Sequence, residues 1–119
     1  MNKITVKLED IKAQTQKALV NHGASERVAE SVAEAVKVAE AENNKVCGLY
    51  YLESYCNQLK SNRVDGSVMP EVKKPSNSSV YVDAKNGFAQ PAFAAGFEMA
   101  INTARENGIC LFTIAHSHT

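Results

Sequence analysis

The sequence of 119 residues has little cysteine, no excess of charge of either sign and no long apolar run. Its 3 cysteines are an odd number at uneven spacing, which argues against a framework of disulfide bonds. The 13 basic and 13 acidic side chains cancel, so no net field favours nucleic acid or an anionic membrane as a partner. No apolar run is long enough to cross a bilayer. We therefore expect a cytoplasmic protein without nucleic-acid or membrane partners.

The phosphate-binding signatures of the common nucleotide folds are also missing. The sequence contains no Gly-x-Gly-x-x-Gly and no Walker motif. In "NGFAQPA" (residues 86–92) one glycine precedes a predicted helix. Backbone N–H groups at such a helix start can bind an anion, or the chain simply turns there from strand to helix. Both interpretations stay open.

The first part of the chain is predicted to be helical. Residues 8–21 place apolar side chains near one face, and Gly23 after them is a typical helix stop. Ser25 is a suitable N-cap for a second helix, in which valines recur at i, i+4 spacing. A third helix with an apolar stripe is predicted after Gly48. Together they predict a helical segment over residues 1–61.

The remainder of the chain changes character. Residues 62–79 are rich in turn-forming residues and predict a connecting loop. "SVYVD" (79–83) is typical of a strand, and "ICLFTIA" (109–115) is a nearly all-apolar strand, as expected when both faces are covered. Residues 89–107 between them predict a helix that ends at Gly108.

That last helix carries a row of large apolar side chains with helical spacing. Its members are Phe93, Phe97, Ile101 and Ala104. Strand, helix and strand make a β-α-β unit over residues 80–119, so the predicted class is α/β (α+β), a three-helix segment followed by the start of a larger sheet. Two strands do not form a stable sheet alone. We therefore expect this sequence to be a fragment whose remaining strands lie downstream.

Two histidines follow the apolar strand. His116 and His118 flank Ser117 at its carboxyl end, where ligands usually bind in open α/β sheets. If the segment stays extended, both imidazoles point to the same side. Two histidines do not complete a zinc site, and we expect no metal. A substrate or cofactor site and an exposed polar loop both remain possible.

The cysteines differ in their surroundings. Cys56 and Cys110 lie in apolar segments and are predicted to be core residues. Cys47 lies at a break before Gly48, at the expected start of the third helix. Because a thiol at a helix N-terminus can have a lowered pKa, Cys47 is a candidate nucleophile.

Three segments together resemble a known family. They are "GLYYLESYCNQLKSNRVDG" (48–66), "VYVDAKNGFAQPAFAAGFEMAINTARENGI" (80–109) and "AHSHT" (115–119). In order and spacing they resemble the malate/L-lactate dehydrogenase-like, non-Rossmann family of NAD(P)-dependent oxidoreductases, closest to its Δ1-piperideine-2-carboxylate and keto-acid reductase branch. The resemblance implies the N-terminal portion of a longer, homodimeric enzyme, in which residues 80–119 begin the cofactor-binding sheet.

The family usually has Ser-His-Gly-x-x-Arg-Leu at the start of its third helix. The histidine there is catalytic or orients the substrate, and the arginine pairs with the substrate carboxylate. Gly48 and Leu52 match this motif, whereas Val46, Cys47 and Tyr51 stand in the places of serine, histidine and arginine. The resemblance therefore implies Cys47 as a catalytic candidate and Tyr51 as a substrate-binding residue.

The family's later Asn-Ser-x-His loop falls on residues 116–119. Ser117 matches, and Thr119 takes the place of the histidine, with His118 adjacent. The resemblance implies His118 as the catalytic acid, His116 and Ser117 as cofactor-binding residues, and Thr119 as substrate-binding. Gln90 matches the glutamine of a family turn and is a further substrate-binding candidate.

The implied function is hydride transfer between NAD(P)H and a 2-keto acid, a 2-hydroxy acid or a cyclic imine carboxylate, with His118 moving the proton. The alternative is a catalytically degenerate or truncated relative that acts as a dimerisation or binding module, because three motif residues are replaced.

Overall fold

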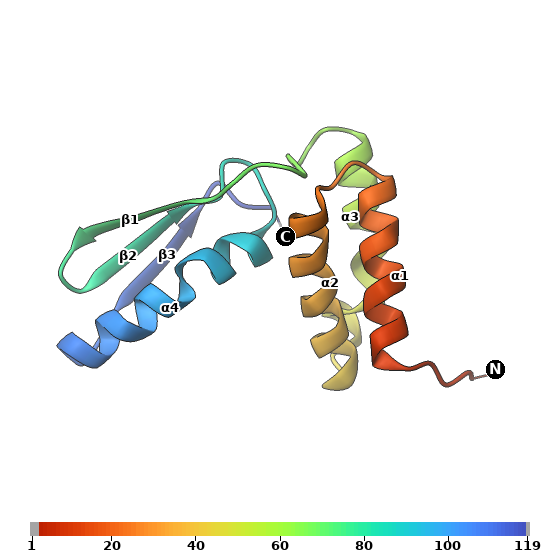
Figure 1. Cartoon of the computed structure of the whole chain (residues 1–119), viewed down its shortest axis with the longest axis horizontal. Helices are drawn as coiled ribbons and strands as arrows, with labels where there is room; N and C mark the ends of the chain where they lie inside the picture. Colours follow the sequence, from red (N-terminus) through yellow and green to blue (C-terminus); the bar gives the residue numbers. More distant parts are fainter. Residues whose placement is uncertain (1–2, 119) are drawn as a thin grey trace. The chain divides into compact units, whose positions relative to one another are not determined.

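The predicted helical and sheet-forming segments are both present (Figure 1). The computed structural model describes residues 3–118 and divides the chain after Asn62 into two units. The first unit holds the helices α1 (Leu8–Asn21), α2 (Glu26–Ala41) and α3 (Leu52–Lys60). The second holds the strands β1 (Glu71–Ser76), β2 (Ser79–Asp83) and β3 (Leu111–Ala115) and the helix α4 (Ala89–Asn107). The predicted α/β class is confirmed.

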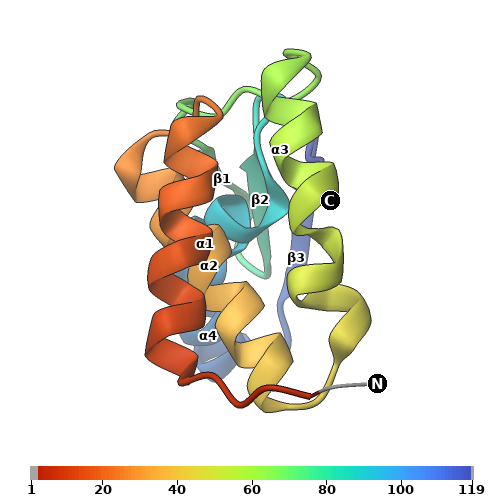
Figure 2. The ribbon, with the colours of Figure 1, turned by 90° about the vertical axis from the view of Figure 1, so that its right-hand side faces the viewer.

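Helices α1 and α2 lie side by side in the first unit (Figure 2). Gly23, at a φ of +112°, lets the chain reverse after α1. The Ser25 hydroxyl caps α2 by accepting a hydrogen bond from the Val28 N–H at 3.3 Å. The predicted helix stop and N-cap are therefore confirmed. The core side chains of this pair include Leu19 from α1 and Val28, Ala29, Val32, Ala33 and Val36 from α2.

The third helix begins later than predicted. Two short 3-10 turns, η1 (Lys45–Cys47) and η2 (Leu49–Tyr51), come before α3. Gly48, with a ψ of −139°, interrupts the helical path between them. Glu40 then caps the second turn, because its Oε1 accepts from the Leu49 N–H at 2.8 Å. A Cβ on Gly48 would collide with the Glu40 carboxylate, so this contact favours glycine.

Strand β1 lies inside residues 62–79, so the prediction of a loop there is wrong for Glu71–Ser76. It pairs antiparallel with β2, with Val72 opposite Val82. Pro75 pointed to a turn because proline has no N–H for a strand ladder. The sheet accommodates it because β1 is at an edge and its pairing shifts register between Lys73 and Ser76.

Strands β2 and β3 are parallel, with Val80 opposite Phe112 and Val82 opposite Ile114. The strand order is β1-β2-β3, so β3 is an edge strand among residues 3–118. Leu111 is 67% exposed, and the prediction that both faces of β3 are covered is not met within this part of the chain. No helix among the same residues has the length and apolar character needed to cross a membrane.

Helix α4 packs on the sheet mainly through small side chains and not through its row of large apolar ones. Its buried positions are Ala92, Gly96, Ala100 and Thr103. A Cβ on Gly96 would lie 2.6 Å from Cγ2 of Val82 and 2.8 Å from Cε2 of Phe112, so helix and sheet approach closely. The large side chains lie one position further round the helix and stay partly exposed: Phe93, Phe97 and Ile101.

Candidate functional site

The carboxyl ends of β2 and β3 lie at one edge of the sheet because the two strands are parallel, with Asp83 opposite Ala115. Residues 84–88 lead from this edge into α4, and residues 116–118 follow β3. Hydrogen bonds join Asp83, the last residue of β2, to His116 and join Asn86 to His118. We call these four residues the strand-end cluster. It lies where open α/β sheets commonly bind ligands.

Asp83 positions the first imidazole. Nδ1 of His116 lies 3.0 Å from Oδ1 of Asp83, and the same oxygen accepts from the Lys85 N–H at 2.8 Å. The Lys85 N–H and, second, the His116 ring hold the pKa of Asp83 below its ordinary value. An ionised carboxylate can only accept, so Nδ1 of His116 carries a proton. The rest of the ring is available to a ligand, because the side chain is 67% exposed.

His118 is held by its backbone and by its ring. Its N–H donates to the Gly87 carbonyl at 2.9 Å, and its carbonyl accepts from the Ala89 N–H at 2.9 Å. Its Nε2 lies 2.9 Å from Oδ1 of Asn86. The segment after β3 is therefore fastened to the first residues of α4, and His118 is half-buried there.

The prediction that both imidazoles point to the same side assumed that the segment after β3 stays extended. The segment is not extended. Strand β3 ends at Ala115, and His116 has a φ of +54° in the left-handed region, so the chain turns at that residue. Each imidazole is consequently held by a different residue, His116 by Asp83 and His118 by Asn86.

The other predicted site residues of the second unit lie close in sequence to this cluster. Ser117 is exposed between the two histidines, and Gln90 is partly buried in the first turn of α4. Thr119 lies outside the described residues. Within residues 3–118, no group of three or more histidine, cysteine, aspartate and glutamate side chains is arranged to hold a metal ion.

Cys47 and Tyr51 belong to the first unit. Cys47 is exposed at the end of η1, and α3 begins only at Leu52. The reason for expecting a reactive thiol, a position at a helix N-terminus, therefore does not hold. Tyr51 ends η2 with its ring centroid 5.9 Å from that of Tyr55.

The two cysteines of the first unit are expected to differ in reactivity. Burial covers Cys56 and raises its pKa, whereas Cys47 is exposed. An aromatic disulfide reagent should therefore label Cys47 at least about tenfold faster than Cys56 in the native protein. Peptide mapping by mass spectrometry measures both rates, with Cys47→Ser as the control. Earlier labelling of Cys56 would contradict the burial of its thiol.

Sequence reasoning missed Asp83 and Asn86 as site residues. An acidic residue at the end of a strand, followed by "AKNG" (84–87), carried a signal that we interpreted only as a turn. Lys85 and Asn86 both have positive φ, at 50° and 66°, which is uncommon for residues other than glycine. Such strained loop positions often occur at functional sites.

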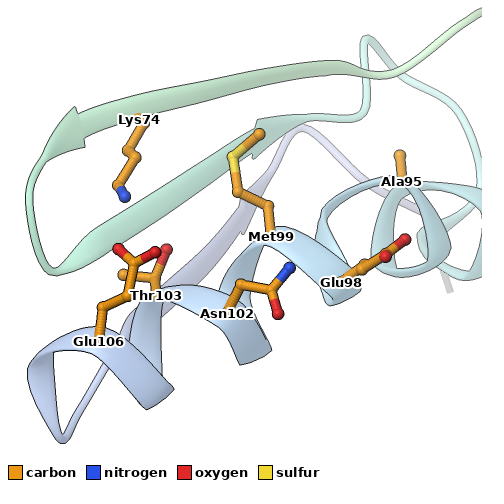
Figure 3. A pocket seen from close by; sticks show the side chains of 7 residues that line it. All are labelled: Lys74, Ala95, Glu98, Met99, Asn102, Thr103 and Glu106. Atoms are coloured by element: carbon orange, nitrogen blue, oxygen red, sulfur yellow. The ribbon is translucent and has the colours of Figure 1, made fainter.

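A groove of about 550 Å³ lies between β1 and α4 (Figure 3). It is lined by Lys74, Ala95, Glu98, Met99, Asn102, Thr103 and Glu106. In Figure 3 the Lys74 side chain points from β1 toward Glu106. None of the lining residues belongs to the strand-end cluster, so the two are separate features. Its lining contains no histidine or cysteine, and we place the candidate chemistry in the cluster.

Comparison with known proteins agrees with the fold. The family model described as malate/L-lactate dehydrogenase matches residues 6–119. A Δ1-pyrroline-2-carboxylate/Δ1-piperideine-2-carboxylate reductase of Pseudomonas syringae pv. tomato is 37% identical over 103 residues, which cover 87% of this chain and 30% of that protein. A (2R)-3-sulfolactate dehydrogenase (NADP+) of Chromohalobacter salexigens is 38% identical over 90 residues, covering 76% of this chain and 27% of that protein.

Solved structures of similar proteins have the same fold as this chain. The Δ1-piperideine-2-carboxylate reductase of Pseudomonas syringae matches with a TM-score of 0.92 at 34% identity, covering 98% of this chain and 35% of that one. A malate dehydrogenase of Entamoeba histolytica, at 20% identity and a TM-score of 0.87, shares the fold. The chain belongs to the malate/L-lactate dehydrogenase family, which confirms the resemblance seen in the sequence. It spans about a third of the length of these relatives.

Proposed function

We propose that this chain is part of an NAD(P)H-dependent oxidoreductase that reduces a cyclic imine carboxylate, with 2-keto and 2-hydroxy acids as related substrates. The observation that carries the proposal is the strand-end cluster, in which Asp83 and Asn86 hold two imidazoles at the carboxyl ends of parallel strands. The names of the relatives support it, because they are reductases of Δ1-pyrroline-2-carboxylate and a sulfolactate dehydrogenase.

The exposed polar groups of this region fit a nicotinamide nucleotide. His116 and Ser117 both present polar groups to solvent, an imidazole and a hydroxyl. The Ser117 hydroxyl can donate to the phosphate and amide oxygens that a nucleotide carries, and Nε2 of a His116 ring protonated at Nδ1 can accept from the carboxamide N–H. We propose His116 and Ser117 as the residues that would hold NAD(P)H, which supplies the hydride when it is bound.

His118 is the proposed general acid. The His118 imidazolium would donate a proton to the imine nitrogen as the imine carbon is reduced, so that the imine becomes an amine. Water then returns a proton to the ring. Cys47 is a second catalytic candidate because it stands at the family's histidine position, not because of a helix N-terminus. Gln90 and Thr119 are proposed to contact substrate. The Tyr51 hydroxyl would donate a hydrogen bond to the substrate carboxylate.

A second function is favoured by one observation. Val46, Cys47 and Tyr51 stand where the family has serine, histidine and arginine, and loss of a guanidinium removes a bidentate clamp for a carboxylate. This favours a catalytically degenerate or truncated member that acts as a dimerisation or binding module. For both functions we propose a cytoplasmic homodimer.

Nucleotide binding separates the two functions. The full-length gene product is titrated with NADH and with NADPH, followed by nucleotide fluorescence and by calorimetry, and then mixed with Δ1-piperideine-2-carboxylate. The reductase is expected to bind at least one nucleotide and to oxidise it when the imine is added. Failure to bind either nucleotide would refute the proposal and favour the binding module.

A further inference from the structure

Asn86 uses all four of its hydrogen-bonding groups. Its backbone N–H donates to the His116 carbonyl at 2.8 Å, and its carbonyl accepts from the Asp65 N–H at 2.8 Å. Its side-chain Nδ2 donates to the Arg63 carbonyl at 3.1 Å. Its Oδ1 lies 2.9 Å from Nε2 of His118. Asn86 therefore connects three segments of the second unit: the residues before β1, the turn before α4 and the residues after β3.

These contacts fix which way the amide faces. The Arg63 carbonyl can only accept, so the atom of Asn86 that faces it must be the donor Nδ2. The reversed amide would set two acceptor oxygens against each other. The amide oxygen is thus the atom that faces His118, and because it can only accept, Nε2 of His118 must be the donor.

We propose that Asn86 is the positioning residue of His118 and holds the ring in the form protonated at Nε2, so that Nδ1 is the nitrogen that transfers the catalytic proton. This inference rests on the proposed function of His118 as the general acid. In the imidazolium both nitrogens carry protons, and the Nε2 proton is engaged by Asn86. Loss of the Nδ1 proton leaves that hydrogen bond intact, so the ring keeps its position throughout the reaction.

The backbone of Asn86 makes the inference testable. Its φ of +66° lies in the left-handed region, which glycine, asparagine and aspartate tolerate. Asn86→Gly therefore removes the amide without backbone strain. Asn86→Asp exchanges the neutral acceptor that faces His118 for a charged one of the same shape, and it also loses the hydrogen bond from Nδ2 to the Arg63 carbonyl. Asn43, with a φ of +58° in the first unit, offers a matched control through Asn43→Gly.

Nitrogen NMR of the histidine-labelled, full-length gene product tests the hydrogen bond directly and needs neither nucleotide nor substrate. We expect the neutral His118 ring to carry its proton on Nε2, with a signal slow enough in exchange to be observed. That signal should persist in Asn43→Gly and disappear in Asn86→Gly. A proton on Nδ1, or an Nε2 proton signal unchanged by Asn86→Gly, would overturn the inference even if the protein is a reductase.

Kinetics test the consequence for catalysis. Asn86→Gly is expected to lower kcat about 10–100-fold with little change in KM, the loss typical for a residue that orients a catalytic group. Asn86→Asp places a carboxylate beside the ring, which favours the imidazolium, and should move the alkaline limb of the kcat profile up by about 1 pH unit or more. The other charged groups of the neighbouring segments, Arg63, Asp65, Asp83, Lys85 and His116, are the same in both proteins. An unmoved pH profile would count against Asn86 as the partner of His118.

Discussion

Replacing His118 by alanine is expected to lower kcat for imine reduction about 10²–10⁴-fold, the range typical for loss of a general acid. The imine nitrogen must gain a proton as the hydride reaches the neighbouring carbon, and without the imidazole that proton has to come from water. KM should change little, because the ring acts on the transition state more than on the bound substrate. The fold should persist, since the backbone N–H and carbonyl of residue 118 keep their partners at Gly87 and Ala89.

Two further variants test whether the loss of kcat is specific to His118. His22→Ala removes an exposed imidazole at the end of α1, whose Nδ1 lies 2.7 Å from the Ala18 carbonyl, and should leave kcat unchanged. Cys47→Ser tests the second catalytic candidate. Steady-state kinetics over a range of pH compare all three proteins. If His118→Ala retained wild-type kcat while Cys47→Ser lost it, the role of proton donor would pass to Cys47.

Features that depend on neighbours in the sequence could be predicted. The stop at Gly23 and the cap at Ser25 depend on residues within one turn of a helix, and both are present in the structure. The valine stripe of α2 was also recognisable, because helical periodicity is a local property. The position of the two histidines after a strand followed from the same kind of local pattern.

Features that depend on distant residues could not be predicted. Pro75 weighs against a strand unless that strand is known to be at a sheet edge, which only the pairing of β1 with β2 establishes. On α4 the sequence shows a row of large apolar side chains, but not which positions face the sheet. Gly96 instead allows the backbone itself to approach Val82 and Phe112, and this closeness is a property of the packed unit.

The candidate site also combines local features, which could be predicted, with contacts between distant residues, which could not. His116 and His118 were candidates from sequence, but their partners lie 33 and 32 residues earlier in the chain. Only the parallel pairing of β2 with β3 brings Asp83 and Asn86 to them. The sequence could therefore indicate which imidazoles were available and could not indicate which of their nitrogens was engaged.

Truncating Leu19 to alanine is expected to lower the free energy of unfolding of the helical unit by about 2–5 kcal/mol. Leu19 is fully buried and is the large apolar side chain that α1 contributes to the core. The loss combines the transfer free energy of the removed carbons with the cost of the cavity they leave. Helix α2, which packs against α1, buries mostly short side chains. Among them are Ala29 and Ala33, which cannot extend into that cavity. We therefore expect a value in the upper half of the range.

Leu8→Ala is the matched control for this prediction. Leu8 begins the same helix and is 39% exposed, so removing the same atoms there should cost less than about 1 kcal/mol. Urea unfolding followed by helical circular dichroism measures both variants, and equal losses would contradict the burial of Leu19. Because the two variants share the helix, the residue type and the number of atoms removed, helix propensity contributes nearly equally to both. The difference between them therefore measures what burial of Leu19 contributes to the stability of the helical unit.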